Sequence, residues 1–148
     1  MPTSYSHTNI VARDPDRLAR FYTEVFDCPR VAERNWTGDW LGRGMGRPGT
    51  ALQVIHVRLP VASGTGPTIE IFRMPDLQPG ERPTQDRPGL MHIAFFVDDI
   101  RYTLEQLLAR GGAALGEISS VDIPGGDSVE FVYARDPEGN IVELQEIK

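Results

Sequence analysis

The chain has 148 residues, a formal net charge of −6 and one cysteine. This length suits one domain, or two small halves that share a core. The acidic balance argues against a general nucleic-acid binder, which needs a basic face, and one cysteine excludes an intramolecular disulfide. The start of the chain lacks the pattern of a signal peptide, and no apolar run approaches the roughly 18 residues of a membrane span. We therefore expect a cytoplasmic protein that binds neither nucleic acid nor membranes.

The first half of the sequence predicts a strand, a helix and three further strands. Residues 5–12 alternate loosely and read as a strand. Asp14 can cap a helix whose first turn holds Pro15, and apolar residues follow at helical spacing. The segments 30–37, 51–60 and 68–74 read as strands. The glycine-rich segment 38–50 between the second and third strands is expected to be a loop.

The second half repeats this order after a segment rich in proline, glycine and charge. Residues 75–88 form the best linker candidate in the chain. Beyond it, residues 90–97 read as a strand, and Asp99 can cap a helix that Gly111 and Gly112 end. Three further strands are expected, at residues 113–121, 128–134 and 141–147.

The two halves also match in their polar residues. His7 precedes Asp14 by seven positions, and His92 precedes Asp99 by the same number. The last strand of each half carries a glutamate between branched apolar neighbours, in the stretches TIEI and IVEL. The sequence therefore predicts two tandem βαβββ modules, at about residues 1–74 and 89–148, joined by the linker 75–88.

Four residues at these matched places are candidate metal ligands: His7, Glu70, His92 and Glu143. Side chains alternate faces along a strand, so each glutamate points away from its apolar neighbours. A buried imidazole or carboxylate is costly unless it is paired or binds a metal ion. Two histidines and two carboxylates suit one divalent ion per chain, namely Zn, Ni, Co, Mn or Fe. A lone strand histidine or glutamate is more often a satisfied or solvated residue, and the repeat is what favours a shared site.

Several stretches carry a family resemblance, among them SHTNIVARDPDRLARFYTEVF, PTIEIF, MHIAFFVDDI and DPEGNIVEL. With these the chain resembles the vicinal oxygen chelate superfamily. That superfamily includes glyoxalase I, methylmalonyl-CoA epimerase, extradiol dioxygenases, fosfomycin-resistance thiol transferases and bleomycin-resistance proteins. The resemblance implies an α+β fold in which two βαβββ modules form a single domain. This domain would be a cupped, barrel-like mixed sheet with helices outside and the metal inside.

The resemblance also implies a class of chemistry. A set of two histidines and two carboxylates is similar to that of glyoxalase I and close to that of methylmalonyl-CoA epimerase. The implied activity is a metal-dependent lyase or isomerase that moves a proton next to a metal-bound carbonyl, through an enediolate. Glu143 is then the first candidate for the catalytic base and Glu70 the second, because a loosely held ligand can leave the metal to accept a proton.

Two other classes of function remain alternatives. A non-heme metal dioxygenase or a thiol transferase can use the same scaffold, although dioxygenases resemble a two-histidine, one-carboxylate set and leave open the place that Glu70 would fill. A non-catalytic small-molecule-binding protein of the bleomycin-resistance type is the other alternative. Such proteins typically lack the metal ligands.

We expect the substrate to be a small molecule, with a thioester or a thiol adduct as candidates. Arg43 and Arg47 in the glycine-rich segment either bind an anionic group of the substrate or are exposed to solvent. His56 and Arg58 share one strand face and either line the cavity or lie on the surface.

Apolar residues in and before the glycine-rich segment suggest a lid or a contact between two copies of the chain. Trp36, Trp40 and Met45 are the residues concerned. With the open ends expected of the sheets, they lead us to expect a homodimer.

Overall fold

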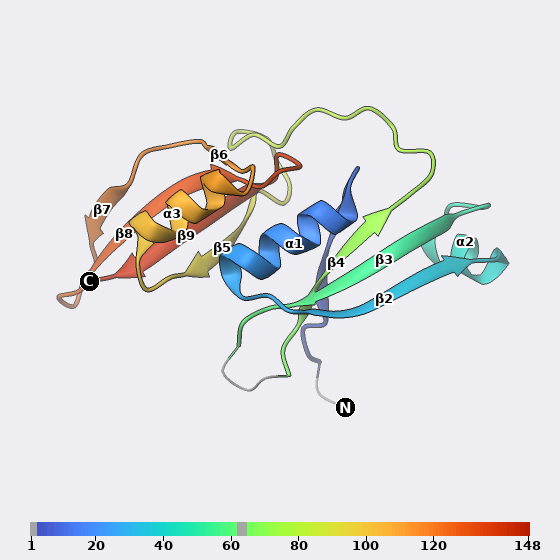
Figure 1. The fold of residues 1–148 in the computed structure, drawn as a ribbon, viewed down its shortest axis with the longest axis horizontal. Coiled ribbons are helices and arrows are strands. Elements are labelled where there is room, and N and C mark those ends of the chain that lie inside the picture. The colour runs from blue at the N-terminus through green and yellow to red at the C-terminus, as the bar shows by residue number, and fades with distance from the viewer. Residues whose placement is uncertain (1–2, 62–64) are drawn as a thin grey trace. The chain divides into compact units, whose positions relative to one another are not determined.

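The computed structural model describes residues 3–61 and 65–148. The chain divides into two compact units, residues 1–79 and 80–148, each with one sheet and a long helix (Figure 1). The fold is α+β with two mixed sheets, as the sequence predicts. No helix in the described residues is both long and apolar enough to cross a bilayer.

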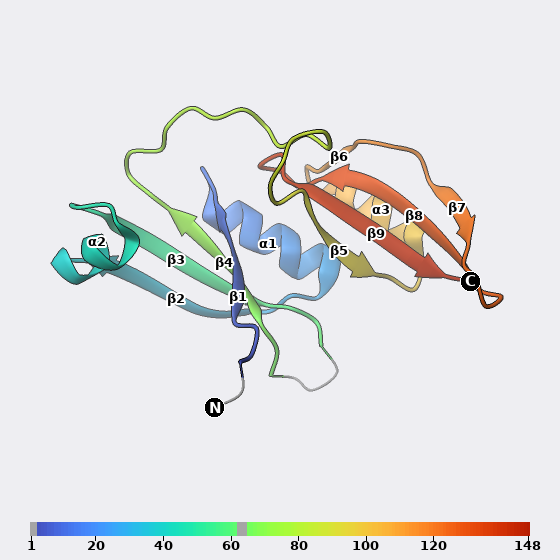
Figure 2. The same ribbon diagram turned by 180° about the vertical axis from the view of Figure 1, so that it is seen from behind.

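Unit 1 is a four-stranded sheet with two helices. Its strands lie in the order β1-β4-β3-β2, with β1 parallel to β4 and the other neighbours antiparallel. Figure 2 shows β1 crossing beside β4 at the edge of this sheet. The elements in chain order are β1 (His7–Val11), α1 (Pro15–Phe26), β2 (Arg30–Thr37), α2 (Asp39–Met45), β3 (Ala51–Arg58) and β4 (Thr68–Arg73).

Unit 2 repeats this plan with five strands and one helix. Its main path is β5-β9-β8-β6, with β7 paired to β8, and β5 is parallel to β9. The elements are β5 (His92–Phe96), α3 (Ile100–Ala109), β6 (Ala113–Ala114), β7 (Ser119–Asp122), β8 (Ser128–Arg135) and β9 (Ile141–Ile147).

Both long helices begin where the capping residues predict. The carboxylate of Asp14 accepts a hydrogen bond from the backbone N–H of Arg17 at 3.0 Å. Asp99 does the same for the N–H of Tyr102 at 2.9 Å. Each cap satisfies a backbone donor that has no partner inside the helix, and so fixes where the helix starts.

Each sheet buries one face beneath its long helix. In unit 1, α1 contacts β3 and β4, and alternate residues of these strands are fully buried. In unit 2, α3 contacts β9 on the face that carries Val142 and Leu144. Because side chains alternate, the glutamate between these two residues lies on the other face of the sheet.

The expectation that residues 38–50 form a loop is wrong, because Asp39–Met45 form the helix α2. Glycines disfavour a helix, but Leu41 is buried against Leu52 and Val54. Packing of this one apolar side chain against the sheet outweighs the low helix propensity of the segment. The helix ends at Gly46, whose positive φ of 65° suits a residue without a Cβ.

The strand expected at residues 113–121 is two short strands instead. Ala113–Ala114 pair with the C-terminal end of β8, and Ser119–Asp122 pair with its N-terminal end. The backbone N–H groups of Leu115 and Gly116 both bond to the carbonyl of Tyr133, which marks an irregularity where the extra residues leave the ladder.

The proline-rich segment holds neither helix nor strand, as predicted, and its two ends are fastened to different units. Arg47 pairs with Asp76 at 2.5 Å within unit 1. The Arg135 guanidinium donates to the carbonyl of Pro83 at 2.9 Å within unit 2. The division between the units falls between Pro79 and Gly80, inside the predicted linker.

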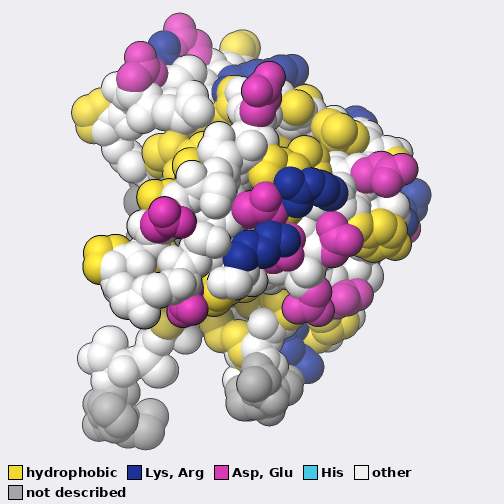
Figure 3. Space-filling model, turned by 90° about the vertical axis from the view of Figure 1, so that its left-hand side faces the viewer, with side chains coloured by type: hydrophobic (Ala, Val, Ile, Leu, Met, Phe, Trp, Pro, Cys, Tyr) yellow, Lys and Arg dark blue, Asp and Glu magenta, His cyan; other side chains and the backbone are white. Residues whose placement is uncertain are grey.

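Charged groups of both signs are interspersed with hydrophobic ones on the face drawn in Figure 3. This mixture accords with the modest negative net charge.

Candidate metal centre

In unit 2 the sheet brings His92 and Glu143 together. The parallel strands β5 and β9 pair Ala94 with Glu143, so His92 lies two residues before the glutamate's partner and on the same face. The Nε2 atom of His92 is 3.0 Å from Oε2 of Glu143. Glu143 is only 7% exposed, so the pair sits in a largely desolvated place.

Two further side chains lie beside the carboxylate of Glu143, and one of them donates a hydrogen bond to it. The amide of Gln145 donates to Oε1 at 2.9 Å. Tyr133 stands directly opposite Glu143 in the β8–β9 ladder, so its side chain lies on the same face of the sheet as this carboxylate. Burial of the phenol raises the pKa of Tyr133, and the neighbouring charge of Glu143 raises it further.

The two nitrogens of the His92 imidazole differ in their surroundings, and only Nε2 points toward Glu143. Its Nδ1 atom is buried and has no hydrogen-bond partner in the described part of the chain. The ring meets the ring of Tyr133 edge-on, with centroids 5.3 Å apart. A buried polar atom without a partner is costly, so Nδ1 would gain from a bound water or another polar partner on the side of the ring away from Glu143.

In unit 1 the same arrangement brings His7 and Glu70 together. The Nε2 atom of His7 is 3.4 Å from Oε2 of Glu70. The other oxygen of this carboxylate, Oε1, lies 3.5 Å from Nδ1 of His56. The side chain of Glu70 is 17% exposed and that of His7 is 41% exposed, so this pair is the more open of the two.

The strand registers make the two sites equivalent place by place. His56 stands opposite Glu70 in the β3–β4 ladder, as Tyr133 stands opposite Glu143 in the β8–β9 ladder. From the sequence alone, His56 could either line the cavity or lie on the surface, and nothing in the sequence pointed to Tyr133. Each of these residues lies on the strand that precedes the glutamate's strand, so the alternation of side chains along that strand could have pointed to it. The connection between the two strands differs in length between the units, however, so the equivalence of His56 and Tyr133 is not visible from their spacing in the sequence.

The donor atoms of each pair fit a shared divalent metal ion. Imidazole nitrogens and carboxylate oxygens bind such ions at about 2.0–2.2 Å, which places two neighbouring ligand atoms about 3.0–3.5 Å apart. The distances of 3.0 Å in unit 2 and 3.4 Å in unit 1 lie in this range. No three His, Cys, Asp or Glu side chains in the described residues surround a common metal position. The structure therefore brings the predicted residues together in two pairs, and their union at one ion stays a prediction.

The arginines and apolar residues of the α2 region are largely exposed, and some of them contact one another or a neighbouring side chain. Arg47 is paired with Asp76, as noted above, and Arg43 lies exposed in the last turn of α2. Trp36 and Trp40 meet edge-on with ring centroids 5.5 Å apart. Both rings remain substantially exposed, and so does Met45.

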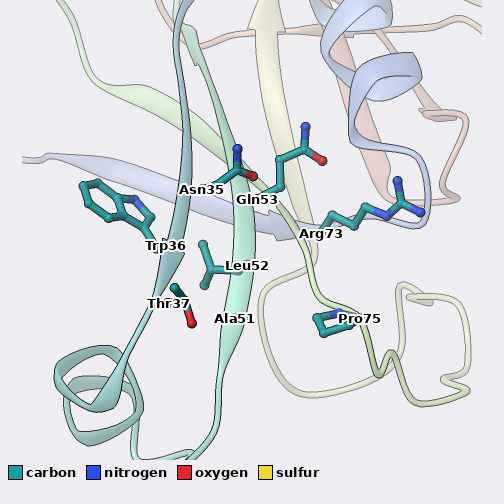
Figure 4. Close-up of a pocket in the computed structure, with 8 residues that line it drawn as sticks. All are labelled: Asn35, Trp36, Thr37, Ala51, Leu52, Gln53, Arg73 and Pro75. Carbon is teal, nitrogen blue, oxygen red and sulfur yellow. The ribbon is translucent and has the colours of Figure 1, made fainter.

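A separate hollow of about 620 Å³ lies in unit 1 (Figure 4). Asn35, Gln53 and Arg73 pair across β2, β3 and β4 and form one polar row along it. Gln53 and His56 are three residues apart on β3, so their side chains point to opposite faces of the sheet. The polar row is therefore distinct from the histidine–glutamate face.

The sequence of the whole chain has a clear family assignment. A family model described as the Glyoxalase/Bleomycin resistance protein/Dioxygenase superfamily matches residues 4–144. The chain belongs to this superfamily. Its members bind small molecules and include enzymes such as glyoxalase I. A search of curated proteins finds no match.

Solved structures of this superfamily share the fold. A glyoxalase family protein from Bacillus cereus has a TM-score of 0.85 and 23% identity, covering 99% of this chain and 95% of that one. A glyoxylase/bleomycin resistance protein/dioxygenase domain from Frankia sp. has a TM-score of 0.64 and 24% identity, covering both chains fully. A glyoxalase I mutant from Zea mays has a TM-score of 0.66 and 20% identity, and the match covers 95% of this chain but 43% of that longer one.

Proposed function

We propose that this superfamily member is a metal-dependent, glyoxalase-like lyase or isomerase. It would transfer a proton next to a carbonyl, by way of an enediolate. In this proposal the two units act as one domain that holds one divalent ion through His7, Glu70, His92 and Glu143. The observation that carries the proposal is the repeated histidine–glutamate pair, at 3.4 Å in unit 1 and 3.0 Å in unit 2, at equivalent strand positions.

The chemistry divides between the ion and the chain. A bound divalent ion would polarise the substrate carbonyl and stabilise the negative charge that develops on its oxygen. A carboxylate of the chain would accept the proton from the adjacent carbon. Glu143 is the first candidate for this base and Glu70 the second.

The carboxylate at the fourth place supports the isomerase reading over a dioxygenase. Iron oxygenases use two histidines and one carboxylate and keep positions free for oxygen and substrate. Here Glu70 faces His7 and would fill one of those positions. The substrate would be a small carbonyl compound, with a thioester or a thiol adduct as candidates, and the enzyme would act as a cytoplasmic homodimer.

Turnover of a carbonyl substrate in D2O tests this proposal. A panel of thiol adducts of 2-oxoaldehydes and of 2-substituted thioesters is incubated with the metal-loaded protein, and product and deuterium incorporation are followed by NMR. We expect turnover by the natural protein and a loss of about 10²- to 10⁴-fold in Glu143→Gln, the contribution typical of a general base. Glu105→Gln, an exposed change on α3, serves as the matched control and should leave turnover unchanged.

Other results would select the alternatives. Full turnover by Glu143→Gln would contradict its role as the base. Oxygen uptake by an iron-loaded protein would favour a dioxygenase, and conjugation of a free thiol would favour a transferase. Tight ligand binding by a protein that takes up no metal would favour a non-catalytic binding protein.

A further inference from the structure

The two glutamates of the site hold equivalent places but have different neighbours. Glu143 receives a hydrogen bond from Gln145 and is faced across the ladder by Tyr133. Glu70 is faced by two imidazoles, those of His7 and His56. The side-chain amide of Asn9 donates to the backbone carbonyl of Glu70 at 3.0 Å. This bond links β1 to β4 and does not involve the carboxylate of Glu70.

The sheet itself places Gln145 and Tyr133 beside Glu143. Gln145 lies two residues further along β9 and therefore on the same face. Tyr133 lies directly opposite on β8. The terminal torsion of a glutamate side chain is broad, so nothing within the residue decides which oxygen points to the histidine. A bond to Oε1 from Gln145 leaves Oε2 toward His92, where it lies 3.0 Å from the ring.

Tyr133 lies beside both members of the pair. It stands opposite Glu143 in the β8–β9 ladder, and its ring packs edge-on against the imidazole of His92, with the ring centroids 5.3 Å apart. Orientation of metal ligands by such outer groups is common in proteins, and losing one typically weakens metal binding by about 10- to 100-fold.

We propose that Tyr133 and Gln145 are positioning residues that preset the histidine–glutamate pair of unit 2 for a metal ion. This inference rests on the proposed function, because it takes His92 and Glu143 as ligands. No hydroxyl or amide side chain in the described residues donates to the Glu70 carboxylate of unit 1, so the unit 2 pair is the more firmly held of the two pairs.

Calorimetric titration of the untagged, metal-free full chain with Co2+ tests the inference. Tyr133→Phe keeps the ring against His92 and removes only the hydroxyl, and Gln145→Met keeps the side-chain length and removes only the amide. We expect each to weaken Co2+ binding by about 10- to 100-fold. The unfolding temperature of the metal-free protein should stay within a few degrees of the natural value. Tyr102→Phe removes an exposed hydroxyl on α3 and should leave the affinity unchanged.

A double-mutant cycle separates positioning from a general effect on the fold. If Tyr133 acts through Glu143, then Tyr133→Phe should have little further effect on affinity once Glu143→Gln is present. Equal losses in both backgrounds would overturn the positioning role. If the natural protein binds Co2+ and both single variants bind it equally well, the inference fails while the metal site stands. A natural protein that binds no divalent ion would overturn both.

Discussion

His7 and His56 approach opposite oxygens of one carboxylate. The first lies 3.4 Å from Oε2 of Glu70 and the second 3.5 Å from Oε1. The two imidazoles are therefore not interchangeable, although both contact the same residue. Only His7 has a counterpart in unit 2 that is also a histidine, and His56 stands where unit 2 has Tyr133.

This asymmetry predicts different outcomes for the two histidines. If His7 is a ligand, His7→Ala should weaken binding of a divalent ion at least about 100-fold, whereas His56→Ala should cost no more than the roughly 10- to 100-fold typical of an outer partner. Calorimetric titration of the two variants side by side measures the difference. A larger loss from His56→Ala would mean that the ligand in unit 1 has been misassigned.

Two glycines of α2 should respond oppositely to alanine. A Cβ at Gly44 meets nothing within 4 Å. Gly44→Ala should therefore stabilise the protein by about 0.4–1 kcal/mol, because alanine lowers the conformational entropy of the unfolded chain. A Cβ at Gly42 would lie 3.1 Å from the backbone of both Arg47 and Pro48, so Gly42→Ala should destabilise it. Urea unfolding measures both. Equal effects would contradict the helix and its packing at this place.

The buried thiol of Cys28 predicts a loss of stability at high pH. Burial raises its pKa from 9.0 to about 12. The folded state therefore holds the proton more tightly than the unfolded chain, and this contribution is complete below pH 9 and lost as the pH rises from 9 towards 12. The difference in unfolding free energy between the natural protein and Cys28→Ala should shrink over that window. A difference that is constant from pH 7 to 11 would argue that the thiol ionises freely in the fold.

The ion pair between Arg101 and Glu130 predicts a loss of stability at low pH. Hydrogen bonds from Arg101, at 2.7 and 2.9 Å, are the main cause that lowers the pKa of Glu130 from 4.5 to about 2. A lowered folded-state pKa gives stability that is present above pH 4.5 and lost as the pH falls towards 2.

Arg101→Gln should therefore be less stable than the natural protein at pH 6, and the gap should close between about pH 4.5 and 2. Denaturant unfolding at stepped pH measures this. Arg20→Gln removes a positive charge from an exposed position on α1 and is the matched control. A gap that persists at pH 2 would show that Arg101 stabilises the fold by packing rather than by pairing with Glu130.

The repeat and the strand pattern were readable in the sequence because they depend on local signals. Helix caps at Asp14 and Asp99 and alternation around Glu70 and Glu143 each rest on a few neighbouring residues. The helix α2 was missed because its stability comes from Leu41 packing on distant strands, against the preference of its own glycines.

The histidines and glutamates of the candidate site could be picked out from the sequence, but the side chains around them could not. The repeat matches His7 with His92 and Glu70 with Glu143, and in the structure each histidine lies within 3.4 Å of the glutamate of its own unit. The side chains that lie beside those carboxylates are set by strand register, and they are His56, Tyr133 and Gln145. Register is set by hairpin length and tertiary packing, which the linear spacing does not reveal.

Metal content measured by elemental mass spectrometry shows whether His7, Glu70, His92 and Glu143 hold one divalent ion. The chain is purified without a histidine tag, as the natural sequence and as His92→Ala. Our account predicts about one divalent ion per natural chain, and loss of that ion in a variant that remains folded. A natural chain that stays free of metal after reconstitution with each of Zn, Ni, Co, Mn and Fe would contradict it, as would a His92→Ala chain that retains the ion.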